Sequence, residues 1–157
     1  MPTTRNDLPD NTRKAMIALL NARLVDTIDL RLSIKQAHWN VKGPTFIALH
    51  ELFDQIQARV DTFADDIAER AVALGGFVAG TSQTLAKNSQ LDAYPTDVSD
   101  ERQHLKLLAD RLAAYGKLAR EAIHTSDESG DKDTADLFTG VSRSIDKDLW
   151  FIEAHLQ

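Results

Sequence analysis

The chain has 157 residues, of which 43% are hydrophobic and 27% charged, and this size and balance suit one globular domain with one core. It contains no cysteine, which excludes disulfides, thiolate metal sites and cysteine nucleophiles and leaves histidine, aspartate and glutamate as the strong metal ligands. The net charge of −6 argues against a generally nucleic-acid-binding surface, and the lack of a long apolar run or a secretory signal predicts a cytoplasmic protein without membrane contact.

The first predicted helix begins near Asp10 or Asn11, after a tail formed by residues 1–9, and ends near His38 or Asn40. Apolar residues recur along it at helical spacing, which indicates one buried face. They are Met16, Leu20, Leu24 and Ile28. The sequence VKGPT then interrupts the helix, because proline cannot continue a helix but suits the first turn of the next one.

A second helix is predicted from about Thr45 to Leu74, where a pair of glycines supplies the stop signal. Its inward-facing positions are again spaced for one helical face. They are Phe46, Phe53, Val60, Ile67, Ala71 and Leu74. Residues 77–98 then form a long connection with room for a short helix.

Ser99 or Asp100 is expected to cap a third helix that ends near His124. The sequence TSDESGDKDT predicts an acidic turn, and a fourth helix follows from about Thr134 to His155. Four long helices with one long connection indicate an all-α four-helix bundle with one crossover, formed by residues 1–157 as a single domain.

The second predicted helix carries two pairs of potential metal ligands. His50 and Asp54 are one turn apart and share a face, and Asp65 and Glu69 repeat this spacing three turns later on nearly the same side. The two aspartates are about 16 Å apart along the axis, whereas metal–ligand bonds measure about 2 Å. One helix therefore cannot close both pairs around one metal ion.

A two-fold axis near the middle of this helix resolves the mismatch. If two copies cross antiparallel, His50 and Asp54 of one chain face Asp65 and Glu69 of the other, and a symmetric dimer holds two identical sites. The Gly-Pro corner brings back His38, which could supply a further nitrogen to each site.

Simpler interpretations of the same residues stay open at this point. Each polar pair could be an ordinary solvated helix face, and Trp39 and Phe46 are of types more often found in a core than beside a metal. A rival di-iron pattern would use Glu-x-x-His on two separate helices. The chain has this pattern twice, at residues 101–104 and 121–124, but both copies lie on one predicted helix about 30 Å apart, so we expect surface residues there.

The sequence KQAHWNVKGPTFIALHELFD, followed by DDIAERAVALGG, closely resembles the signature of the Dps family of mini-ferritins. The segments AYPTD and SRSIDKDLWFIEAHLQ also resemble this family, and the similarity extends from about Asn6 to Gln157. The resemblance implies a ferritin-like four-helix bundle with a short helix in the long connection. It also implies assembly into a hollow homododecamer.

Carried over position by position, the resemblance implies a di-iron ferroxidase centre shared by two subunits. One subunit would provide His38, His50 and Asp54, and its two-fold mate would provide Asp65 and Glu69. A mixture of imidazole and carboxylate ligands suits Fe(II). The family also has a tryptophan beside this centre, which matches Trp39 and would take up stray oxidising equivalents.

The activity implied is oxidation of Fe(II), with hydrogen peroxide preferred over molecular oxygen, followed by storage of a ferric mineral. Acidic residues near the start of the fourth helix would line threefold entry pores; these are Asp131, Asp133 and Asp136. The alternative is a DNA-compacting protein associated with the nucleoid, which binds iron only incidentally.

DNA binding is expected to be weak or absent at physiological salt, because it depends chiefly on Lys and Arg side chains that neutralise phosphates. The tail before the first helix contains Arg5 but no lysine, and Asp7 and Asp10 oppose its charge. In a mobility-shift titration of plasmid DNA, the protein should bind far more weakly than a variant with three added N-terminal lysines. Tight binding that is lost on deletion of residues 1–9 would contradict this prediction and favour the nucleoid alternative.

Overall fold

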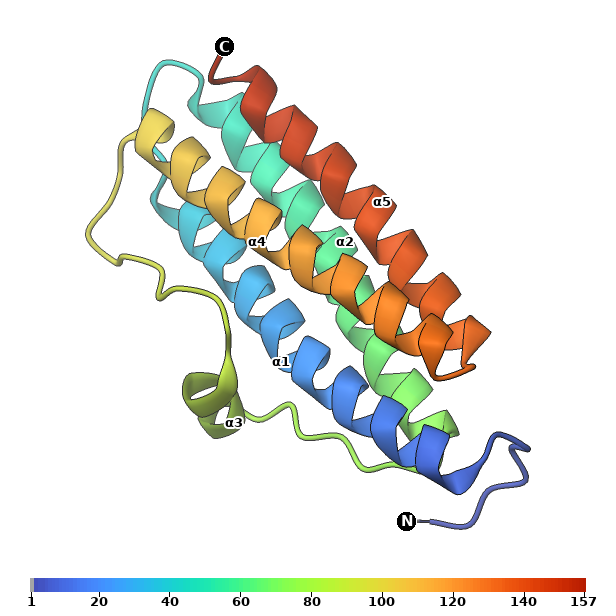
Figure 1. The fold of residues 1–157 in the computed structure, drawn as a ribbon. Coiled ribbons are helices and arrows are strands. Elements are labelled where there is room, and N and C mark those ends of the chain that lie inside the picture. The colour runs from blue at the N-terminus through green and yellow to red at the C-terminus, as the bar shows by residue number, and fades with distance from the viewer. Residues whose placement is uncertain (1) are drawn as a thin grey trace.

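The computed structural model describes residues 2–157, which form five helices (Figure 1). These are α1 (Asp10–Asn40), α2 (Phe46–Ala73), α3 (Ser82–Asn88), α4 (Glu101–Glu128) and α5 (Lys132–Ala154). The four long helices lie side by side, and the crossover between α2 and α4 runs along the outside of the bundle with α3 beside α1 (Figure 1). The prediction of an all-α bundle with a short helix in its crossover is confirmed.

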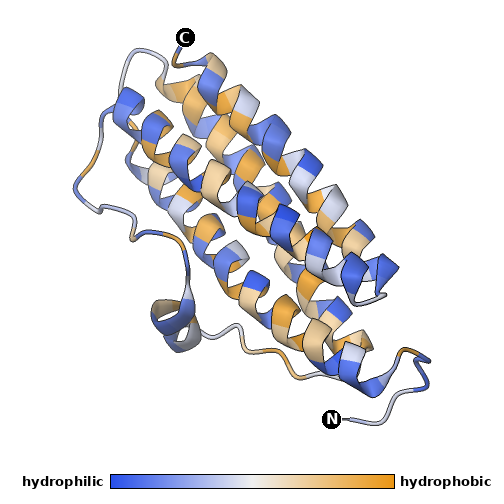
Figure 2. Ribbon diagram, viewed as in Figure 1, coloured by the Kyte–Doolittle hydropathy of each residue, from blue (hydrophilic) through white to orange (hydrophobic). Residues whose placement is uncertain are grey.

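Two clusters of buried side chains fill the bundle. One contains the fully buried Phe53 and Tyr115, and the other contains Met16 and Phe138. Apolar positions face the neighbouring helices while charged positions cover the outside (Figure 2). Burial of these side chains is the main stabilising contribution, at about 25 cal/mol per Å² of apolar surface. Across residues 2–157, no helix combines the length and the apolar character needed to cross a membrane.

Two inward-facing positions predicted from periodicity differ in the structure. Phe46 is 42% exposed because it is the first residue of α2, beyond the end of the core, where its ring tilts against that of His50. Ile28 is only partly buried, because it borders an open pocket between α1 and α2. The other predicted core positions of both helices are buried.

The predicted end of the third long helix is wrong by four residues, since α4 continues past His124 to Glu128. The composition of its last turn is polar and typical of a loop. The turn nevertheless packs against the bundle, because Ser126 is fully buried. Gly130 then turns the chain with φ +81°, and Asp131 caps α5 by accepting a hydrogen bond from the Thr134 amide. Since Asp131 is buried, its predicted place in a pore wall is also wrong.

The start of α4 fastens the crossover to the bundle. His104 was expected on the surface, but only 1% of it is exposed, and both ring nitrogens contact the crossover. Its Nδ1 lies 2.7 Å from the Tyr94 hydroxyl, and its Nε2 lies 3.1 Å from the Val98 carbonyl oxygen. Arg111 lies two turns further along the same face of α4. It donates to the carbonyls of Asp92 and Ala93 and covers the ring of Tyr94. Helix α4 thus binds the crossover at two successive levels.

This buried histidine predicts a loss of stability in mild acid. Burial lowers the pKa of His104, an effect that the Val98 carbonyl and Asp100 only partly oppose. The unfolded chain takes up this proton near pH 6.5, so the unfolded state binds more protons as the pH falls below that value. The free energy of unfolding should therefore decrease from about pH 6.5 downward, until the lowered pKa of the folded state is passed.

Denaturant titrations at several pH values between 5 and 8 measure this effect. The variant His104→Gln should be less stable at pH 7.5 but show a shallower dependence on pH below 6.5. The variant His124→Gln is the matched control, because His124 lies on the same helix but is exposed. If the free energy of unfolding depends on pH equally in wild type and His104→Gln, the loss of stability in mild acid does not come from His104.

Candidate metal centre

Two histidines face each other across the corner between α1 and α2. His38 lies in the last turn of α1, and His50 lies in the second turn of α2. Their rings are stacked, with centroids 3.7 Å apart and planes inclined by 22°. The Gly-Pro turn therefore returns the chain so that two side chains twelve positions apart come into direct contact.

The two rings hold each other through reciprocal hydrogen bonds to the main chain. Nδ1 of His38 is 2.7 Å from the carbonyl oxygen of His50, and Nδ1 of His50 is 2.9 Å from the carbonyl oxygen of His38. A carbonyl only accepts, so each Nδ1 must carry the proton. In the neutral rings, the lone pair then resides on Nε2, which is the state that a metal-binding histidine requires.

Asp54 lies one turn beyond His50 on α2 and is paired with Lys35 of α1. The hydrogen bond from the Lys35 ammonium is the main cause that lowers the pKa of the Asp54 carboxyl; desolvation partly opposes it, and the charge of Lys35 adds to it. Asp54 is therefore an ionised, exposed acceptor at neutral pH. The ammonium group occupies Oδ1 of this carboxylate, so a metal ion can bind through Oδ2 or take the place of the ammonium group.

Lys35 opens the signature segment, but its pairing with Asp54 was not predicted from the sequence. It lies three residues before His38, and this spacing places both side chains on one face of α1. The three-residue spacing from His38 was the feature of the sequence that could have placed Lys35 beside the histidine pair.

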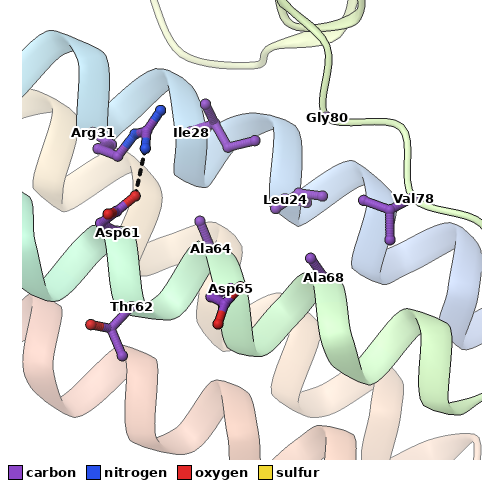
Figure 3. Close-up of a pocket in the computed structure, with 10 residues that line it drawn as sticks. All are labelled: Leu24, Ile28, Arg31, Asp61, Thr62, Ala64, Asp65, Ala68, Val78 and Gly80. Atoms are coloured by element: carbon purple, nitrogen blue, oxygen red, sulfur yellow. Dashed lines mark hydrogen bonds and ion pairs between the residues drawn. The ribbon is translucent and has the colours of Figure 1, made fainter.

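The second acidic pair lies farther along α2. Asp65 is exposed and borders the pocket between α1 and α2, where Ala64 and Ala68 point toward α1 while the Asp65 side chain points away from it (Figure 3). Glu69 is also exposed and borders a different pocket between α2 and α5. Within residues 2–157 of one chain, no three His, Asp or Glu side chains are grouped closely enough to hold a metal ion.

An apolar surface surrounds the histidine pair. Trp39 is 65% exposed, and Phe46 and Ile47 beside the corner are 42% and 61% exposed. The alternative that Trp39 and Phe46 are core residues is therefore wrong for the single chain. Both instead flank His38 and His50 on an outer face of the bundle.

The two Glu-x-x-His segments of α4 do not form a rival centre. The carboxylate of Glu101 accepts hydrogen bonds from Thr45, and His104 uses both nitrogens within the crossover. Glu121 and His124 are exposed, as expected. Glu121 pairs with Lys117 along the helix surface, and Nε2 of His124 lies 3.2 Å from the Glu128 carboxylate.

Comparisons with known proteins agree with this architecture along nearly the whole chain. A family model for the ferritin-like domain matches residues 17–157. A protein of Agrobacterium fabrum named DNA protection during starvation protein is 49% identical over 154 residues, which cover 98% of this chain and 95% of that protein.

Solved structures show the same likeness. A Dps from Mycobacterium smegmatis has a TM-score of 0.95 at 30% identity, with coverage of 100% of this chain and 94% of that one. A Dps from Vibrio cholerae, described as a member of a broad superfamily of ferritin-like diiron-carboxylate proteins, has a TM-score of 0.92 at 25% identity. That comparison covers 100% of this chain and 98% of that one.

Proposed function

The chain belongs to the Dps family of ferritin-like proteins, and on that premise we propose that it is a ferroxidase that oxidises Fe(II) and stores the ferric product inside a hollow homododecamer. Each oxidation site is shared by two subunits. His38, His50 and Asp54 of one subunit bind Fe(II), and Asp65 and Glu69 of the two-fold mate complete the site.

The observation that carries this proposal is the state of the histidine pair. Both Nδ1 atoms donate to main-chain carbonyls, so both Nε2 atoms are free to bind a cation. Asp54 adds an ionised carboxylate one turn away. Imidazole nitrogens and carboxylate oxygens together suit Fe(II), so the residues present fit the substrate ion.

Helix geometry supports the shared site. Asp54 and Asp65 are eleven residues apart, which corresponds to about 16 Å along α2, so the second pair cannot reach the same ion from the same chain. Asp65 and Glu69 are exposed and therefore available to a partner. The exposed apolar surface beside Trp39 and Ile47 is the kind of surface that a subunit contact covers.

The reaction that we propose uses hydrogen peroxide as the preferred oxidant, with molecular oxygen reacting more slowly. Two Fe(II) ions give one electron each to one peroxide molecule; the O–O bond breaks, and two protons complete two water molecules. Paired one-electron transfers release no hydroxyl radical. The protein's contribution is to hold two ions at fixed positions and to supply ligands that remain negatively charged or neutral.

The negative charge of the chain is compatible with a substrate that is a cation. Asp133 and Asp136 remain exposed near the start of α5 and retain the role proposed for them in guiding cations through threefold pores. The net charge of −6 on each subunit would raise the local concentration of Fe(II).

DNA compaction with incidental iron binding is the alternative function, and the name of the Agrobacterium relative refers to DNA protection. The N-terminal segment of this chain offers little support for it. Arg13 donates to the carbonyl oxygens of Leu8 and Leu74, which ties the segment before α1 to the end of α2. Lys14 lies within α1, as predicted, and not on a free extension.

The shared site predicts recovery of activity between two inactive variants. His50→Ala/Asp54→Ala and Asp65→Ala/Glu69→Ala should each lose most peroxide-dependent Fe(II) oxidation. After subunit exchange, a mixed dimer combines one doubly damaged site with one intact site. An equal mixture should therefore regain about a quarter of the wild-type sites, since half of the dimers are mixed.

The matched control mixes His50→Ala/Asp54→Ala with His38→Ala. Both lesions then lie in the same half of the site, so exchange leaves no intact site and the rate should not recover. Mass measurement verifies that subunits have exchanged. An exchanged complementary mixture that stays as inactive as this control would contradict the shared site.

Trp39 is proposed to intercept oxidising equivalents that escape from the site, because it is adjacent to His38 and largely exposed. The variant Trp39→Phe should assemble and bind Fe(II) normally but show more protein oxidation during peroxide turnover, as measured by mass spectrometry. Trp150→Phe is the control, because Trp150 is 61% exposed near the C-terminal end of α5. Equal oxidation in wild type and Trp39→Phe would leave Trp39 as a packing residue.

A further inference from the structure

The corner between the two histidines has almost no core of its own. Every residue from 42 to 48 is exposed, and only Val41 and Leu49 on either side of this segment are fully buried. Burial of Val41 and Leu49 anchors the two ends of the corner in the core, but no buried side chain between them holds the first turn of α2 in place. The separation of His38 and His50 must depend on other contacts as well as on their own hydrogen bonds.

One set of contacts joins the corner to the start of α4. The Lys42 amide donates to the Ser99 carbonyl at 2.8 Å, and the Glu101 amide donates to the Lys42 carbonyl at 3.1 Å. The Glu101 side chain then reaches past Gly43 to the first residue before α2. A Cβ atom on Gly43 would lie 2.3 Å from the Glu101 carboxylate, so this close approach requires glycine.

The second contact caps α2 from another helix. One carboxylate oxygen of Glu101 accepts from the Thr45 amide at 3.0 Å and from the Thr45 hydroxyl at 2.8 Å. Thr45 makes no side-chain cap of its own, and the first turn of α2 contains no acidic residue. Among residues 2–157, Glu101 is the one side chain of another helix that hydrogen-bonds this corner. Its charge also lies where the dipole of α2 favours an anion.

From these contacts we infer that Glu101 is a positioning residue for the metal centre: its carboxylate fixes the start of α2 and thereby the ring of His50 against that of His38. Four residues, slightly more than one turn, connect Phe46 at the start of α2 to His50. A shift of the first turn therefore moves the His50 ring directly. This inference rests on the proposed function and extends it to a residue that touches no metal ion.

Three substitutions of Glu101 distinguish the effect of its side-chain length, which allows the hydrogen bonds to Thr45, from the effect of its charge. Glu101→Gln keeps the length and an acceptor oxygen, so both bonds from Thr45 can persist. Glu101→Asp keeps the charge in the first turn of α4 but withdraws the carboxylate from Thr45 by one methylene. Glu101→Ala removes both. Glu121→Ala is the matched control, since Glu121 is an exposed glutamate of the same helix.

Each variant is purified as the assembled protein and titrated anaerobically with Co(II), a redox-inert probe whose absorption spectrum reports its ligands. We expect Glu101→Ala and Glu101→Asp to bind Co(II) about tenfold more weakly, which is the size of effect seen when a group that orients a ligand is removed. Glu101→Gln and Glu121→Ala should stay within about twofold of wild type. The KM for Fe(II) should rise in the first two variants by more than kcat falls.

Wild-type Co(II) affinity and spectrum in assembled Glu101→Asp would overturn the inference, even if that variant were less stable. If Glu101→Ala does not assemble, the Co(II) affinity of Glu101→Asp alone tests whether Glu101 positions the metal centre. Loss of Co(II) binding in Glu101→Gln as strong as in Glu101→Asp would also overturn it, because reach would then not matter. Failure of the proposed function is a different result, in which wild type itself neither binds Co(II) nor oxidises Fe(II).

Discussion

The reciprocal hydrogen bonds between His38 and His50 are the contact on which the candidate centre depends. Each ring donates to the main chain of the other residue, so the end of α1 and the start of α2 are joined at the corner. The same bonds place the lone pair of both rings on Nε2. One contact therefore determines both the position of the two side chains and the tautomer in which they can bind a metal ion.

The rest of the bundle supports this contact through the first turn of α4. Glu101 reaches outward to Thr45 and holds the start of α2, while His104 points inward and holds the crossover at Tyr94 and Val98. These two side chains are three residues apart and could be mistaken for a metal-binding pair. In the folded chain they instead attach two loops to the start of α4: Glu101 binds the corner between α1 and α2, and His104 binds the crossover.

Several features of the fold could be predicted from the sequence because they depend on neighbouring residues. Proline and glycine at the Gly-Pro corner separate α1 from α2, and of the two predicted caps of α4, Ser99 and Asp100, it is Asp100 that caps the helix. The prediction was wrong where tertiary packing overrode local composition. Ser126 lies in a polar segment typical of a turn, yet it is buried in α4, and His104 is buried although most of its neighbours in the sequence are polar.

The sequence by itself determined that His50 and Asp54 share a helix face and that Asp65 lies about 16 Å farther along, since the rise of an α-helix is constant. Only the tertiary structure decided which atoms meet. The His38–His50 contact, the pairing of Lys35 with Asp54 and the capping of Thr45 by Glu101 join residues 12, 19 and 56 positions apart. Such contacts depend on the relative positions of whole elements, which are set jointly by packing of the core and by hydrogen bonds between distant residues, and not by local spacing.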